Sequence, residues 1–523
     1  MFLISSFQPE PSVEFEGYCW QGTDLIVGPE GAEEYRRIRQ REVTFDNDGC
    51  YVLVKRRARG WTVGTDSRGL ARLFLYEAGN RWAVSSSLTE LVEHLRSHGV
   101  ILSTRPELLR PFGERGAFTS QITTSETYIS GIRLVPSFSR ISLSADGPEL
   151  HHAEQPLAES YESALSHYLS TWRSRVMTLL DDERVSVSAD LSGGLDSRTV
   201  LAFLLSTGEF DTRRKRFRLA SSRDKQDDLR AASTIADHYG LELNGHQATA
   251  GSPRDDAGSM GHWERNSLGV YLPLYLNNQT FNAFQFQAHG AGGGNFRPHF
   301  KDSSIEDRIN RYKRRIDSDE HSRWLDTTLS DMETLQRWRP LTPIMVLHYR
   351  EFRNRFHFGH NPHRRAMLTP LNSSMTDQLT DGPTGVSARQ FYFDTMESLS
   401  PGLKDLPYDS PEKSPDDDVR RSITRAEVAD LAPGRIYGTS PGHQVTSHHA
   451  QSSPYAAWLE AAGRATTNAD VREFLGPDAS IRCDEALTQV ARAERPLGSH
   501  HRATLDLSHA LLVEFALGQR PAL

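Results

Sequence analysis

A short run of glycine, serine and aspartate carries the clearest chemical information in this sequence. Two adjacent glycines let a backbone approach a ligand closely, and amides at the start of a helix attract anions. An aspartate beside phosphates is stable only when a divalent cation joins the two. The run therefore predicts a nucleotide phosphate site that uses Mg²⁺, with Asp196 as metal ligand. Its residues are Leu191, Ser192, Gly193, Gly194, Leu195, Asp196 and Ser197.

The residues on either side of the run predict how it is held. Residues 185–191 alternate and are rich in valine, which is typical of a strand, whereas residues 199–205 place apolar side chains at helical spacing. Residues 217–222 predict the next parallel strand, and residues 227–236 predict a helix. We therefore expect a doubly wound parallel sheet, with its ligand beyond the carboxyl ends of the strands.

The motif differs from the phosphate loop that ends in Gly-Lys-Ser or Gly-Lys-Thr, which does not occur in the chain. It resembles the Ser-Gly-Gly-Leu-Asp-Ser motif of the ATP pyrophosphatases, and the chain resembles the asparagine synthetases among them, with their relatives the β-lactam synthetases and lasso-peptide cyclases. The resemblance implies an adenine nucleotide α-hydrolase-like domain with ATP and Mg²⁺ as cofactors. The ATP-binding residues it assigns here are Leu191, Ser192, Gly193, Gly194, Asp196 and Ser197.

A second glycine-rich run, residues 287–297, resembles the loop with which these synthetases hold pyrophosphate. The family usually has an acidic residue after its glycines, but here Gly294 and Asn295 stand there, and an uncharged amide lowers the expected affinity for magnesium. Arg297 is either a compensating phosphate ligand or a surface arginine. The residues that the resemblance assigns to ATP binding in this run are Gly290, Gly292 and Gly293.

Later segments carry further resemblances. Residues 364–372 resemble a segment near the substrate of the synthetases, with Asn372 in place of the usual aspartate. Relatives use a lysine in the following part of the domain to stabilise charge as pyrophosphate leaves. Lys413 is our catalytic candidate by position, and Lys404 is the other option.

Residues 1–145 resemble the glutaminase domain of the family in three segments, residues 64–69, 85–87 and 131–136. The resemblance implies a degenerate Ntn-type, glutaminase-like α+β sandwich. The family's nucleophile is a cysteine directly after the initiator methionine, and here that position is Phe2, which cannot act as a nucleophile. If Met1 is the true start, we expect that the chain does not hydrolyse glutamine.

The remaining chain completes the predicted domain order. We expect a linker over residues 146–160 and a synthetase-like domain with a C-terminal helical part over residues 161–523. A chain of 523 residues is too long for one ordinary core, which agrees with two domains. No apolar run approaches the roughly 20 residues of a membrane-spanning helix, and no signal peptide is evident, so we expect a cytoplasmic protein.

Charge and composition limit the kinds of partner and metal site that we expect. The 60 basic and 68 acidic residues give a net charge of −8, which argues against broad binding to nucleic acid. The three cysteines are widely spaced and predict neither disulfides nor a zinc site. The histidines in residues 357–363 lack carboxylate partners in the sequence, so we favour a structural role over a metal site.

These observations predict an ATP-dependent ligase that forms amide bonds. Its partners would be a small-molecule or peptide carboxylate, which is adenylated with release of pyrophosphate, and an amine or ammonia; an oligomer is possible. The alternative is a catalytically degenerate homologue that binds a nucleotide or a partner, because Phe2, Gly294, Asn295 and Asn372 depart from the family pattern.

Overall fold

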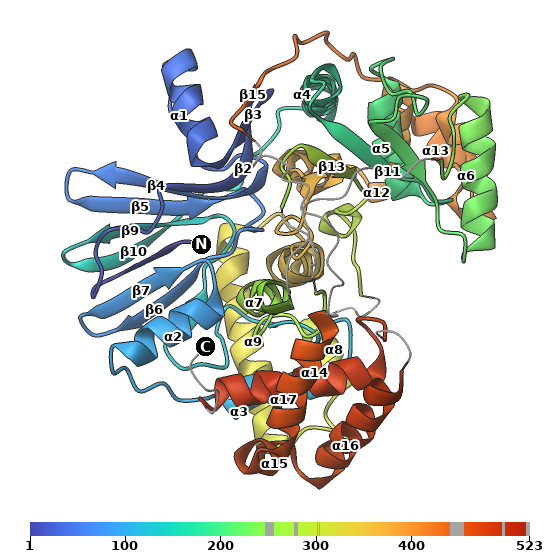
Figure 1. Cartoon of the computed structure of the whole chain (residues 1–523). Helices are drawn as coiled ribbons and strands as arrows, with labels where there is room; N and C mark the ends of the chain where they lie inside the picture. The colour runs from blue at the N-terminus through green and yellow to red at the C-terminus, as the bar shows by residue number, and fades with distance from the viewer. Residues whose placement is uncertain are drawn as a thin grey trace.

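The computed structural model describes residues 1–245, 256–276, 281–300, 302, 304–439, 454–493 and 497–518. Within these residues the strands form three sheets, and helices surround them (Figure 1). This mixed α/β architecture confirms the predicted fold class. Among the described helices, none combines the length and the apolar character needed to cross a bilayer.

The amino-terminal region is a sandwich of two sheets, drawn in blue in Figure 1. Ile4 and Val84 of the smaller sheet share a buried cluster with Val52 and Val63 of the larger sheet, so the two inner faces pack together. Helix α2 covers the outer face of the smaller sheet, and α1 covers the outer face of the larger one. The elements are β1 (Leu3–Ser5), β2 (Phe15–Gln21), β3 (Asp24–Val27), α1 (Gly28–Arg39), β4 (Gly49–Arg57), β5 (Gly60–Thr65), β6 (Phe74–Ala78), β7 (Arg81–Ser85), α2 (Leu88–Ser97), α3 (Pro106–Leu109), β8 (Ile132–Leu134), β9 (Ser139–Ser144) and β10 (Gly147–His152).

The sandwich extends beyond the boundaries predicted for it. Residues 147–152, which lie within the predicted linker, form β10 and pair with β9 in an antiparallel hairpin. Strand β10 lies at the edge of the larger sheet and has few buried side chains, so its sequence lacks the apolar alternation of a half-buried strand. At the opposite edge, β15 (Ile436–Tyr437) pairs with β3 in parallel and brings a strand from the predicted second domain.

A parallel sheet forms the centre of the second region, in the order β12-β11-β13-β14. Strand β11 comes first in the chain, β12 adds on one side of it and β13 on the other, so the connections reverse direction at β11. In sheets of this kind, ligands bind beyond the carboxyl ends of the strands at the point of reversal. The elements are α4 (Tyr161–Asp181), β11 (Ser186–Asp190), α5 (Leu195–Leu205), β12 (Phe217–Ala220), α6 (Gln226–His238), β13 (Gln285–Ala288), β14 (Ala366–Leu368) and α12 (Ala388–Leu399).

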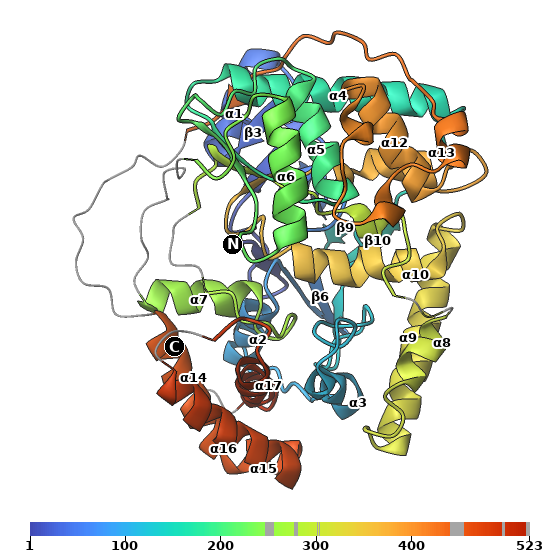
Figure 2. The ribbon, with the colours of Figure 1, turned by 90° about the vertical axis from the view of Figure 1, so that its right-hand side faces the viewer.

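Helices complete both regions. Helix α4 buries the predicted face that includes Leu165, Trp172 and Leu179, and these side chains share one core cluster with the parallel sheet. Figure 2 shows α14 to α17 gathered apart from α5 and α6, and α7 packs against α14. The remaining helices are α7 (Asp256–Asn266), α8 (Ile305–Asn310), α9 (Ser318–Trp338), α10 (Ile344–His348), a π-helix (Tyr349–Phe358), α11 (Asp377–Thr380), α13 (Asp417–Ser422), α14 (Pro454–Thr467), α15 (Ala469–Leu475), α16 (Pro477–Arg492) and α17 (Arg502–Ala516).

Candidate active site

The first glycine run folds into a tight loop between β11 and α5. The amide of Leu191 donates to the carbonyl oxygen of Ala220 at 2.8 Å, which joins the start of the loop to the end of β12. The amide of Ser192 donates to Oγ of Ser197 at 3.0 Å, and the two hydroxyl oxygens lie 2.9 Å apart. The amide of Gly194 donates to Oγ of Ser192 at 3.2 Å. The serines therefore fix the loop in its turn.

The second glycine run meets the first at the carboxyl ends of β11 and β13. A Cβ atom at Gly290 would lie 2.7 Å from the amide nitrogen of Ser197, and one at Gly293 would lie 2.4 Å from Oδ1 of Asp196. Gly292 has a φ of +113°, and its Cβ atom would lie 2.4 Å from the carbonyl carbon of Leu371. Any side chain at these positions would push the loops apart, so the structure explains why the run consists of glycines.

Asp196 lies at the junction of the two loops. Its Oδ2 accepts a hydrogen bond from Nη2 of Arg297 at 3.1 Å, and its Oδ1 accepts one from the hydroxyl of Tyr392. Burial raises the pKa of Tyr392 well above its usual value, and the nearby Asp196 carboxylate raises it further, so this hydroxyl remains a donor. Tyr392 lies among the apolar residues of α12, and no motif in the sequence predicted its contact with Asp196.

The carboxylate of Asp196 suits a magnesium ion that binds together with phosphates. Within the described ranges, no group of three or more histidine, cysteine or carboxylate residues is arranged to hold a metal ion, and this includes the histidines in residues 357–363. Magnesium is usually bound through one or two carboxylates together with substrate phosphates and waters. A single carboxylate at the junction of two glycine loops fits that pattern and does not fit a preformed metal cage.

Asn295 and Asn372 lie against each other behind the second loop. Nδ2 of Asn295 donates to Oδ1 of Asn372 at 2.7 Å, and both side chains are buried. The carbonyl oxygen of Asn295 also accepts a hydrogen bond from Nε of Arg350 at 2.5 Å, and Arg350 forms a buried ion pair with Asp381. Both asparagines stand where the resemblance led us to expect acids, and the structure brings these two departures together.

Lys413 lies beside the first loop through Asp409. Its Nζ donates to Oδ2 of Asp409 at 2.6 Å, and the amide of Asp409 donates to the carbonyl oxygen of Gly193 at 3.3 Å. Lys404 instead pairs with Glu397 at 2.9 Å, at the end of α12. Of the two lysine candidates, the structure therefore brings Lys413 to the glycine loops.

Arg198 holds the segment that carries Asp409 and Lys413. Its side chain is fully buried, and its guanidinium carbon lies 3.6 Å from the centre of the Tyr408 ring. Burial lowers its pKa from the usual arginine value. Its nitrogens donate at 3.2, 2.7 and 2.5 Å to three carbonyl oxygens, which belong to Leu403, Leu406 and Pro407.

One amide of the first loop already contacts an anion from the chain itself. The amide of Gly193 donates to Oδ1 of Asp228 at 2.9 Å, and Asp228 belongs to the first turn of α6. A carboxylate oxygen at this amide demonstrates that the loop presents a donor to a negative group. The sequence predicted this helix but not its contact with the loop.

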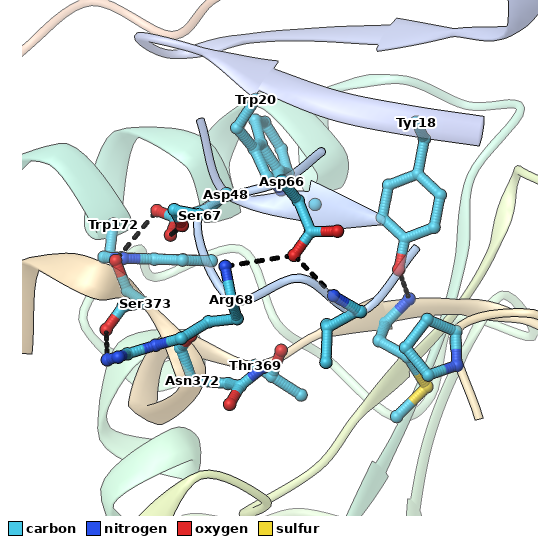
Figure 3. Close-up of a pocket in the computed structure, with 14 residues that line it drawn as sticks. Tyr18, Trp20, Asp48, Asp66, Ser67, Arg68, Trp172, Thr369, Asn372 and Ser373 are labelled. Atoms are coloured by element: carbon cyan, nitrogen blue, oxygen red, sulfur yellow. Dashed lines mark hydrogen bonds between the residues drawn. The ribbon is translucent and has the colours of Figure 1, made fainter. Parts of the chain in front are cut away.

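A small cavity lies where the sandwich meets the parallel-sheet region (Figure 3). Its volume of about 20 Å³ is room for about one water molecule. Beside it, Arg68 donates to the carbonyl oxygens of Asn372 at 3.1 Å and Ser373 at 2.6 Å, and pairs with Asp377 at 2.8 Å. Through Arg68, the sandwich thus holds the segment that carries Asn372.

Comparison with known protein families gives a match over the first glycine loop. A family model described as asparagine synthase matches residues 176–259, which include the end of α4, β11, the first glycine loop, α5, β12 and α6. A search of curated proteins finds no match. The segment that builds the first glycine loop is therefore similar to asparagine synthase.

Proposed function

We propose that the protein is an ATP-dependent ligase that adenylates a carboxylate and transfers the acyl group to an amine or ammonia. The observation that carries this proposal is the meeting of two glycine loops at Asp196, beyond the carboxyl ends of β11 and β13, where this sheet reverses direction. The similarity of residues 176–259 to asparagine synthase supports the same class of reaction.

The proposed reaction has two steps. A carboxylate oxygen of the substrate attacks the α-phosphorus of ATP, the bond to the oxygen bridging the α- and β-phosphorus atoms breaks, and pyrophosphate leaves. The amine nitrogen then attacks the acyl carbon, the bond to AMP breaks, and the nitrogen loses a proton. Rates in such reactions depend on holding the reactants in line and on neutralising phosphate charge.

Residues near the loops have distinct proposed roles. In the first loop, the amide of Gly193 would exchange the carboxylate of Asp228 for a phosphate oxygen. The glycines of residues 290–293 let the backbone of the second loop approach phosphate oxygens closely. Asp196 would hold a magnesium ion, which supplies positive charge to the phosphates. Lys413 stabilises the charge of the leaving pyrophosphate from its place beside Gly193 and Asp409.

The nitrogen donor is proposed to come from outside the chain. Phe2 is fully buried between the sheets, and Cys19, Cys50 and Cys483, the chain's three cysteines, are also buried. Burial raises the pKa of each thiol, to about 11 for Cys483 and further for the other two. Thiols of this kind stay protonated at neutral pH and are poor nucleophiles, which supports a ligase without its own glutaminase activity.

The test is pyrophosphate release from ATP and Mg²⁺ across a panel of carboxylates, with and without ammonia. Release should require a carboxylate and should vanish in Asp196→Ala. The Asn295 and Asn372 pair favours a second candidate, a nucleotide-binding homologue without turnover, because neither amide brings charge for a metal. ATP binding with no pyrophosphate release for any carboxylate would support that candidate and reject the ligase.

A further inference from the structure

Arg297 lies where the second glycine loop faces the first. Its Nη2 bonds to Oδ2 of Asp196 at 3.1 Å, and 46% of its side chain is exposed. Its guanidinium carbon lies 5.7 Å from the centre of the Tyr392 ring. The contact with Asp196 uses one of the five N–H groups of a guanidinium, and the planar fork of this group matches two oxygens of a phosphate.

Two other arginines near the loops serve the fold. Arg198 is fully buried and donates to carbonyl oxygens, and Arg350 is 5% exposed and pairs with Asp381 at 2.6 Å. Each is held by several protein acceptors in a site that solvent does not reach. Arg297 differs from both because nearly half of its side chain is accessible, at the same junction where Asp196 meets the glycine loop.

The buried side of the second glycine loop carries two uncharged amides. Asn295 and Asn372, whose amides bond at 2.7 Å, occupy the buried side of the second loop. Asp196 is the carboxylate that contacts Arg297 directly. A phosphate that approaches this junction meets Arg297 and Asp196, while Asp228 and Asp409 lie at Gly193 of the first loop. Asp196 is the carboxylate for which a divalent cation would compete with Arg297.

We propose that Arg297 is the ligand of the pyrophosphate portion of the nucleotide, and that it exchanges partners on binding. Without a nucleotide, Asp196 holds the guanidinium beside the glycine loops. When a cation takes the carboxylate, Arg297 turns to the phosphate oxygens, so that the arginine supplies positive charge where the second loop has amides. This inference rests on the proposed nucleotide site and names its ligand on the second loop.

The experiment is calorimetric titration of the full chain with inorganic pyrophosphate, once in Mg²⁺ and once in EDTA. In Mg²⁺, Arg297→Gln should weaken binding at least tenfold, because the charged fork is lost. In EDTA the loss should be smaller, because Asp196 still holds the guanidinium of the wild type. Arg297→Lys keeps the charge and should lose less. Arg230→Gln, on the exposed face of α6, is the matched control and should bind like the wild type.

The variant Asp196→Asn tests whether Arg297 exchanges partners or only attracts the phosphate, through the direction in which pyrophosphate affinity changes. Without Mg²⁺, this variant should bind pyrophosphate more tightly than the wild type, because Arg297 is released and a repelling charge is removed. The gain should be smaller when Asp196→Asn is combined with Arg297→Gln, because only the released arginine contributes beyond the removed charge. With Mg²⁺, the same variant should show no further gain. Wild-type affinity in Arg297→Gln, or weaker metal-free binding in Asp196→Asn, would overturn the proposal.

The role of Arg297 in binding pyrophosphate and the proposed ligase reaction can fail independently of each other. Pyrophosphate binding that depends on Arg297, in a chain that never releases pyrophosphate from ATP, would uphold the ligand and reject the ligase. Turnover that proceeds in Arg297→Gln with wild-type pyrophosphate affinity would uphold the ligase and reject the ligand. Thermal unfolding of each variant checks its folding. If Arg297→Gln has a lowered melting temperature, the pyrophosphate affinity of Arg297→Lys is used in its place.

Discussion

The side-chain amide of Asn295 donates to the side-chain oxygen of Asn372 at 2.7 Å, and this one bond joins the second glycine loop to the segment gripped by Arg68. A continuous set of contacts thus runs from the sandwich to the candidate active site. It gives the amino-terminal region a structural role that needs no catalytic nucleophile, because Arg68 holds the backbone on which Asn372 stands.

Replacing both asparagines by aspartate should make stability strongly dependent on pH. Two carboxyl groups at this distance cannot both ionise in a buried site, so one pKa rises well above its usual value. The free energy of unfolding of Asn295→Asp/Asn372→Asp should therefore fall as the pH rises from 5 to 8. Urea unfolding at several pH values measures this, and a decline no steeper than in the wild type would contradict the expected repulsion.

Loss of the Arg68 contact should destabilise the fold. Arg68→Ala removes the bonds of the guanidinium to Asp377 and to the carbonyl oxygens of Asn372 and Ser373, although Asp377 keeps Arg350 at 3.2 Å. A hydrogen bond to a charged group typically contributes about 1.5–3 kcal/mol, so the free energy of unfolding should fall by at least this much. Arg57→Ala, at the exposed end of β4, is the control and should cost little. Denaturant unfolding measures both variants, and equal stability of the two would show that the Arg68 contacts do not support the fold.

Asp66 should make the free energy of unfolding depend on pH. Burial raises its pKa to about 6, and hydrogen bonds from the amides of Ala71, Leu70 and Arg68 limit the rise. The protonated acid is thus favoured in the folded chain, so this group adds to the free energy of unfolding as the pH falls from about 6 to about 4. The size of this contribution is on the order of 3 kcal/mol.

Asp66→Asn removes the titration and is the variant to compare. The difference in unfolding free energy between the wild type and Asp66→Asn should shift in favour of the wild type as the pH falls through this range. A comparison of the two proteins cancels the effects of other titrating groups. A constant difference between pH 7 and pH 4 would show that Asp66 titrates at its usual pKa.

Lys413→Ala should lower the rate of pyrophosphate release with little change in ATP affinity, since the lysine acts on charge that develops as pyrophosphate leaves. Removing one such group typically lowers kcat by about 10²–10³-fold. Lys404→Ala is the matched control, because Lys404 pairs with Glu397 away from the loops. A similar loss in both variants would reject a specific role for Lys413.

Gly293→Ala should abolish ATP binding. Its Cβ atom would lie 2.4 Å from Oδ1 of Asp196 and 2.5 Å from the Tyr392 hydroxyl, so the loops must separate. Gly463→Ala, within helix α14, meets nothing within 4 Å and should stabilise the chain by about 0.4–1 kcal/mol. Calorimetric titration with ATP and thermal unfolding measure the two effects, and wild-type ATP affinity in Gly293→Ala would show that the second loop tolerates a side chain.

The sequence by itself determined the local parts of this protein. The strand, loop and helix around residues 191–197 were predicted because glycine, serine and alternating valine express their preferences over a few neighbouring residues. The parallel order of β11 and β12 and the apolar face of α4 follow from patterns of the same short range. Strand β10 escaped prediction because an exposed edge strand carries little apolar pattern.

Only the tertiary structure decided which distant residues meet. Tyr392 reads as a core residue in α12, yet its hydroxyl reaches Asp196 from 196 residues away along the chain. The contact of Asn295 with Asn372 and that of Asp409 with Gly193 likewise join distant segments, and neither segment's sequence predicts its partner. Such contacts arise from the packing of the sheet and helices in three dimensions, which no pattern of neighbouring residues encodes.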